Sequence, residues 1–136
     1  MQRFEILPHT ADTAVAIYGE SFDDLFANAG SALFELMFDI PPGSRGARVS
    51  VSAEADGIEE LLVAWLSELL VRSEVEGMVF SDLEVEVMDN RVAASGRAVP
   101  VDQLELIGTP IKAVTYHDLE IRRVGTRWVA RVVFDV

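Results

Sequence analysis

Two segments of the chain carry apolar residues at helical spacing. In the stretches around them, apolar and polar residues alternate as they do in β-strands. The first follows Ser21, with Asp24 three residues on as in a capping box, and runs until Asp39 and the following diproline stop it. The second follows Asp56, with Glu59 as its capping partner, and ends near residue 77. Because each helix must bury its apolar stripe, the helices need a further layer to pack against.

The remaining stretches supply that layer. Their β-branched, aromatic and alternating residues predict short strands, and Asp89–Asn90 and Gly125–Thr126 predict the turns of two hairpins. Residues 100–110 are expected to form a loop or a short helical turn. The expected strands are 4–7, 14–18, 48–53, 83–88, 91–99, 111–116, 119–124 and 128–134. The fold class is therefore α+β and two-layer, with two amphipathic helices packed on a largely antiparallel mixed sheet in a single domain, 1–136.

Composition excludes several classes of function. The chain has no cysteine, which excludes disulfides, thiol nucleophiles and cysteine-ligated metals. Its formal charge of −12 disfavours direct nucleic-acid binding, and it suits a basic partner, a bound cation or simply a solvated acidic surface. No apolar run approaches the roughly 20 residues that span a bilayer. Residues 1–5 do not resemble a signal peptide, so we expect a cytoplasmic protein.

Carboxylates at two distant positions are candidate metal ligands. Asp12 lies in the bend after the first expected strand, and Asp135 directly precedes Val136 and its terminal carboxylate. Adjacent oxygen donors of this kind suit hard divalent cations. An aspartate in a turn is also a common turn former, and the sequence does not by itself bring Asp12 beside the other two.

Two further charged residues stand out by their context. Lys112 is the only lysine beside ten arginines, and a compact, titratable ammonium does chemistry that a guanidinium does not. Glu68 falls inside the apolar sector of the second helix, so we expect it to be partly buried and to need a cation. Either Arg72, at i+4 on the same helix, or Lys112 could supply that cation.

Other chemistries lack their motifs. His9 and His117 do not have the spacing of a metal-binding pair, and the chain contains no GxSxG elbow. The sequence Gly43-Ser44-Arg45-Gly46 is too short for a phosphate-binding loop. A stand-alone NTPase or hydrolase is therefore unsupported.

Several short motifs, taken in order, resemble the archease family over the whole chain. Together they are far more specific than any one of them. They are His9-Thr10-Ala11-Asp12, Gly19 with the helix after it, Met37-Phe38-Asp39, Ile111-Lys112-Ala113-Val114-Thr115-Tyr116-His117 and Phe134-Asp135-Val136.

The resemblance implies a protein that activates an enzyme and has no catalytic residues of its own. Archeases assist the RtcB-type RNA ligase, promoting guanylylation of its active-site histidine by GTP and multiple turnover in tRNA splicing and RNA repair, and they can broaden nucleotide use. GTP would be engaged only together with the ligase. The resemblance implies a divalent cation, with Ca²⁺ ahead of Mg²⁺ or Mn²⁺, at Asp12, Asp135 and the main-chain oxygen of Val136. It makes Glu68 and Lys112 the other residues needed for activation.

Two features qualify this comparison. Residues 105–110 lack the histidine and the final glutamate that relatives commonly carry there, which predicts a different docking loop. Asp39 matches a recurrent acid of the family, but it could equally be a turn former at a helix end, and we place it outside the metal ligands. Two other functions stay open at this point: a metal-dependent phosphohydrolase that works alone, and a general chaperone-like binding protein.

Overall fold

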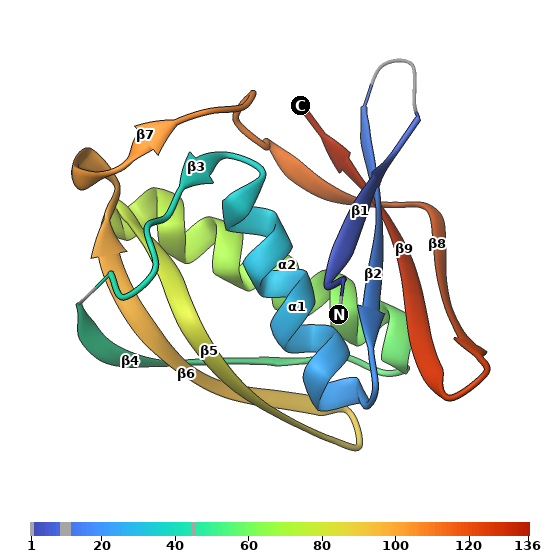
Figure 1. Ribbon diagram of the computed structural model, residues 1–136. Coiled ribbons are helices and arrows are strands. Elements are labelled where there is room, and N and C mark those ends of the chain that lie inside the picture. The colour runs from blue at the N-terminus through green and yellow to red at the C-terminus, as the bar shows by residue number, and fades with distance from the viewer. Residues whose placement is uncertain (1, 9–11, 45) are drawn as a thin grey trace.

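The computed structural model describes residues 2–8, 12–44 and 46–136 (Figure 1). Its helices are α1 (Phe22–Glu35) and α2 (Ile58–Glu76), with a 3₁₀ turn at Val101–Gln103. The strands are β1 (Phe4–Leu7), β2 (Thr13–Gly19), β3 (Phe38–Asp39), β4 (Ala47–Glu54), β5 (Met78–Met88), β6 (Arg91–Pro100), β7 (Glu105–Leu106), β8 (Ala113–Val124) and β9 (Arg127–Asp135).

The strands form three antiparallel sheets. The largest has the order β1-β2-β9-β8, a second has the order β4-β6-β5, and β3 pairs with β7 in a small third sheet. The four-stranded sheet lies on the right of Figure 1 and the three-stranded sheet on the lower left. The α+β class with two helices on antiparallel strands is confirmed, but the described strands are divided among three wholly antiparallel sheets where the sequence predicted one mixed sheet.

The two helices fill the space between the larger sheets. α1 contacts β2 and β5, whereas α2 contacts β4 and β8, so each helix touches both sheets. The fully buried Trp65 of α2 donates a 2.9 Å hydrogen bond from Nε1 to the carbonyl oxygen of Phe26 in α1. This bond satisfies a polar group that burial would otherwise leave without a partner, and it fixes the two helices relative to each other.

The start of α1 follows the sequence prediction, but its end does not. Ser21 Oγ accepts a 3.1 Å hydrogen bond from the N–H of Asp24, and the Asp24 carboxylate accepts one from the N–H of Glu20. The helix ends at Glu35, before Asp39. The interpretation of Asp39 as a helix-end turn former was wrong, because Phe38–Asp39 forms β3 and pairs with Glu105–Leu106.

The predicted capping box of α2 was also wrong. The N-cap is Gly57, which makes no side-chain cap, and Asp56 Oδ1 instead accepts a hydrogen bond from the side chain of Asn90. The helix ends as expected at Gly77, whose φ of 67° is the left-handed conformation that glycine adopts readily.

The predicted strands at 111–116 and 119–124 are one strand, β8, with a register shift between Thr115 and Glu120. Asp118 in this irregular stretch has a φ of 51°, which aspartate tolerates better than most residues. No helix in the described ranges is long and apolar enough to cross a membrane.

Candidate functional site

Three strand ends meet at one end of the four-stranded sheet. The register pairs Thr13 with Phe134, so Asp12 and Asp135 are the next residues along β2 and β9. On the other side of β9, Ala113 pairs with Asp135, and the N–H of Lys112 donates a 2.8 Å hydrogen bond to the carbonyl oxygen of Asp135. Antiparallel pairing thus brings Asp12, Lys112, Asp135 and Val136 to the same sheet end.

The residues at this sheet end differ in burial: some anchor the strand in the core and others face solvent. Phe134 is fully buried and Val136 packs partly against the core, so these two hold the terminal strand in place. Asp135 between them is exposed, Asp12 is half-buried and Lys112 is exposed. The charged groups are therefore displayed on a rigid strand end, with little burial of their own.

The oxygen donors at this sheet end are of the types that bind hard divalent cations. Asp12 and Asp135 supply carboxylate oxygens and Val136 a main-chain oxygen, which are the ligand types that Ca²⁺ and Mg²⁺ take. Among the described residues, no group of three or more histidine, aspartate or glutamate side chains is arranged to hold a metal. Two side-chain donors and one main-chain donor would leave further positions of a six- to eight-coordinate ion to water or to a partner.

Glu68 is not joined to the sheet end by any ion pair in the part of the chain that the structure describes. It lies half-buried on α2, as predicted. The proposed pairing with Arg72 is wrong, because Arg72 Nε instead lies 2.8 Å from Oε2 of Glu76. Arg72 also donates to the carbonyl oxygen of Ser50 at 2.6 Å, so its guanidinium is committed away from Glu68.

The structure describes one of the two histidines, and His9 lies outside the described residues. His117 is on the irregular stretch of β8, where its Nε2 lies 3.3 Å from Oδ2 of Asp118 and its backbone N–H donates to Oγ1 of Thr115.

The departure from the family pattern at residues 105–110 falls beside β3. The N–H of Ile107 donates a 2.8 Å hydrogen bond to the carbonyl oxygen of Met37, and the N–H of Ile111 contacts Sδ of the same methionine at 3.3 Å. Leu106 and Ile107 are nevertheless more than half exposed. The backbone of this segment is therefore held in place by hydrogen bonds, while its apolar side chains are exposed to solvent.

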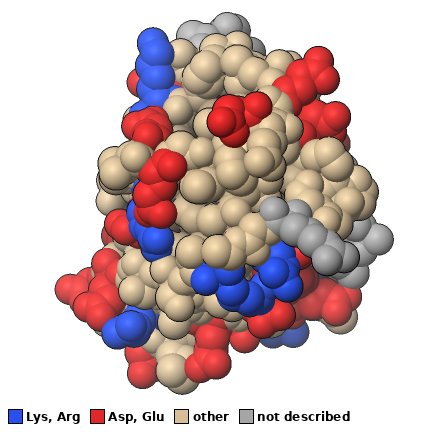
Figure 2. Space-filling model, turned by 90° about the vertical axis from the view of Figure 1, so that its left-hand side faces the viewer, with Lys and Arg blue, Asp and Glu red and all other residues tan. Residues whose placement is uncertain are grey.

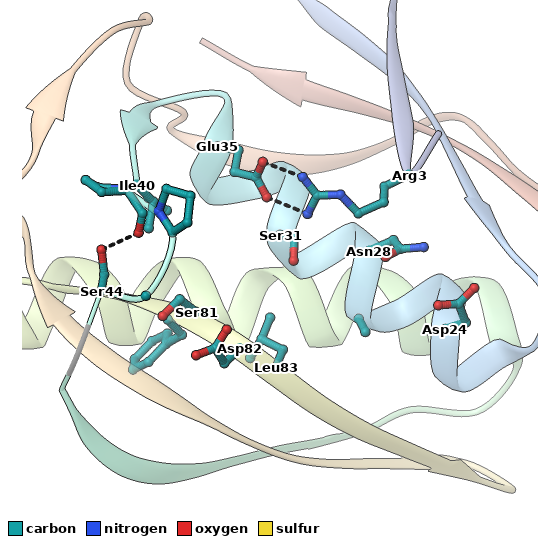
Figure 3. Close-up of a pocket in the computed structure, with 15 residues that line it drawn as sticks. Arg3, Asp24, Asn28, Ser31, Glu35, Ile40, Ser44, Ser81, Asp82 and Leu83 are labelled. Carbon is teal, nitrogen blue, oxygen red and sulfur yellow. Dashed lines mark hydrogen bonds and ion pairs between the residues drawn. The ribbon is translucent and has the colours of Figure 1, made fainter. Parts of the chain in front are cut away.

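The structure also contains a cleft that the sequence does not reveal. It measures about 500 Å³ and lies between α1, the segment before residue 45 and an irregular part of β5 (Figure 3). Arg3 forms a bidentate pair with Glu35 on its wall, at 2.7 and 2.6 Å, and this bond raises the pKa of the arginine. Ser81 Oγ is buried without a partner, and Asp82 follows with a φ of 50°. The cleft is lined by both polar and apolar residues, and most of its charged groups are paired. It therefore offers no arranged set of catalytic groups.

Charge is unevenly distributed over the surface. The chain has 23 acidic and 11 basic residues. On the face shown in Figure 2, acidic side chains lie along the left edge, the bottom and the upper right, with one group in the upper middle, whereas basic side chains form separate groups on the left and below the centre.

Comparison with known proteins identifies the family. The model of the archease protein family matches residues 4–136. The chain belongs to the archease family. A protein archease of Methanopyrus kandleri is 36% identical over 138 residues, which cover 98% of this chain and 99% of the relative.

Two solved structures share the fold of this chain. The solution structure of protein 1598 from Methanobacterium thermoautotrophicum superposes with a TM-score of 0.72 at 29% identity, over 100% of both chains. A Thermotoga maritima protein described as an archease and possible chaperone superposes with a TM-score of 0.69 at 23% identity, over 97% of this chain and 96% of that one, and it supports the fold. The family match over residues 4–136 and the 36% identical relative confirm the archease resemblance inferred from the sequence motifs.

Proposed function

We propose that this chain is an accessory protein of an RtcB-type RNA ligase and that it promotes guanylylation of the ligase active-site histidine by GTP. The observation that carries the proposal is the meeting of Asp12, Lys112 and Asp135 at one sheet end, from three distant parts of the chain. Membership of the archease family supports it. In this role the chain turns over no substrate, and its client is another protein.

The sheet end has properties that suit this role. Its two aspartates and the main-chain oxygen of Val136 would hold a divalent cation, most favourably Ca²⁺, from one side. The bound ion would supply positive charge to offset the phosphates of GTP at the ligase. Lys112 is exposed, and no ion pair joins it to a described residue, so its ammonium is available to a partner or a phosphate. Glu68 is proposed as a fourth residue needed for activation, on the basis of its match to the family.

The test is ligase guanylylation from labelled GTP, with the chain at a substoichiometric ratio to the cognate ligase. We expect the chain to raise the initial rate of label incorporation and Asp12→Asn to remove the effect. Asp89→Asn is the matched control, because Asp89 is an exposed aspartate in the distant β5–β6 turn and has a φ of 52° that asparagine also tolerates. An unchanged rate with a competent cognate ligase would refute the proposal.

The same samples separate the two alternatives. A stand-alone phosphohydrolase releases phosphate from nucleotide or RNA without ligase, and it loses that activity in Asp12→Asn. A general chaperone-like protein protects unrelated clients from aggregation, with no dependence on Lys112. The accessory role predicts neither result.

A further inference from the structure

The outer face of the four-stranded sheet has a hollow in its middle, because small residues there are surrounded by long ones. The registers align Ala16 with Arg131 and Glu120, and Tyr18 with Val129 and Arg122. Ala16 is only 7% exposed. The longer side chains around it enclose a space of about 380 Å³.

Arginines dominate the polar wall of this hollow. Three of the chain's ten arginines line it: Arg122, Arg127 and Arg131. Alternation along β8 and β9 directs them to the same face. Such a gathering of guanidinium groups is notable on a chain with a formal charge of −12.

The hydrogen-bonding capacity of these arginines is only partly used. The Arg127 guanidinium lies 4.4 Å from the centre of the Tyr18 ring, an arrangement that leaves its N–H groups free. Within the described ranges it forms no hydrogen bond or ion pair. Nε of Arg131 is buried without a hydrogen-bond partner. A buried N–H of this kind is costly to leave unpaired, so a small movement of the Arg131 side chain that brings this group to an acceptor in the hollow would be favourable.

Neighbouring carboxylates compete only weakly for these groups. Arg122 Nε lies 3.5 Å from Oε1 of Glu120, which also lines the hollow, and Arg131 Nη2 lies 3.9 Å from Asp118 Oδ2. Both carboxylates are more than half exposed, and exposed pairs at such distances contribute little. Glu5 is engaged with the hydroxyl of Tyr18 at 3.0 Å.

We propose that this hollow binds a terminal phosphate group, as carried by a nucleotide or by an RNA end. A phosphate has several oxygens that can accept from more than one guanidinium at once, in the bidentate geometry that arginine favours. The net charge of −12 opposes a long polyanion, so a single terminal group fits better than an extended strand. The hollow is a separate site from the acidic sheet end, and it requires no ligase to be present.

The first experiment follows the Nε–H resonances of the arginines by NMR. Inorganic phosphate, guanosine monophosphate, and a short RNA with either a 5′-phosphate or a 5′-hydroxyl are titrated at constant ionic strength. Saturable shifts of the Arg127 and Arg131 resonances are expected with the phosphate-bearing probes. Tighter binding of the phosphorylated RNA than of the nucleotide identifies the RNA end as the source, and the reverse order identifies the nucleotide. The proposal is overturned if sodium chloride shifts these resonances as much as the phosphate-bearing probes do, or if no probe shifts them.

The second experiment uses variants that keep the fold. Arg127→Gln and Arg122→Gln should each weaken phosphate binding about tenfold, which corresponds to the loss of a charge-assisted hydrogen bond. Arg91→Gln is the control, because Arg91 is an exposed arginine paired with Glu54 on the other sheet. Arg131→Gln is included if its thermal unfolding matches that of the parent. Equal weakening by Arg91→Gln would show a general charge effect and no site in the hollow.

Discussion

The backbone N–H of Lys112 donates a 2.8 Å hydrogen bond to the carbonyl oxygen of Asp135. The structural role of Asp135 thus resides in its main chain, while its carboxylate is exposed. This separation lets the function of the side chain be tested without disturbing the fold.

Asp135→Asn should leave stability almost unchanged and abolish ligase activation. The substitution keeps the carbonyl that accepts from Lys112 and removes only an exposed charge, and surface changes of this kind usually alter the free energy of unfolding by less than about 0.5 kcal/mol. Urea unfolding and labelled-GTP incorporation measure the two effects. Full activation by this variant would remove Asp135 from the proposed site.

Lys112→Arg tests whether an ammonium is required or only a positive charge. The side chain is exposed, so the larger guanidinium fits without strain and the melting temperature should not change. Activation should fall strongly, because a guanidinium differs from an ammonium in size, shape and hydration. The control is Arg123→Lys, the reverse exchange at an exposed position of β8. Activation equal to that of the parent would show that charge alone suffices.

The helix caps show how far local sequence reasoning extends. Ser21 and Asp24 are three residues apart, and the predicted cap forms because its partners are fixed by that spacing. Asp56 and Glu59 have the same spacing, yet Asp56 bonds to Asn90, which lies 34 positions away on the β5–β6 turn. A competing long-range partner cannot be read from a window of four residues.

The candidate site depends on such long-range information. Asp12 and Asp135 come together only through the register of β2 and β9, which sequence alone did not supply. The strand at Phe38–Asp39 likewise exists because residues 105–106 pair with it. The hollow around Ala16 was missed for the same reason, since its arginines belong to two strands whose shared face depends on the pairing.

Tyr18 should titrate above its ordinary pKa of 10.0. Burial raises the pKa of the phenol most, its hydrogen bond and charge interaction with Glu5 raise it further, and the positive charge of Arg127 lowers it. Since the folded state favours the protonated phenol, this stabilising contribution is complete below pH 10 and is lost as the pH rises through the folded pKa. The ultraviolet difference titration between the parent and Tyr18→Phe reports this midpoint. Glu5→Gln should lower it, and an unchanged midpoint would contradict the contribution assigned to Glu5.

Gly19→Ala should destabilise the fold by about 1–3 kcal/mol. A Cβ at this position would collide with the backbone nitrogen and Cα of Leu25 in the first turn of α1. Because the collision is with the backbone, the cost of Gly19→Ala should be the same whether or not the fully buried Leu25 has been shortened to alanine. Urea unfolding of the parent, the two single variants and the double variant measures this cost, and a much smaller cost in the shortened background would place the strain in the side chain of Leu25.

Trp65→Phe should cost about 2–4 kcal/mol of unfolding free energy. The indole is fully buried, and its Nε1 bonds to the carbonyl oxygen of Phe26 at 2.9 Å, so the substitution leaves both a cavity and a buried acceptor with one partner fewer. Trp128→Phe is the matched control, because Trp128 lies at the half-buried start of β9, where its ring contacts Phe22 with centroids 4.6 Å apart. Loss of the buried indole should also loosen α1 against α2, which amide hydrogen exchange would detect as faster exchange in both helices. Equal losses of stability in the two variants would mean that the bond between the helices adds nothing beyond the size of the ring.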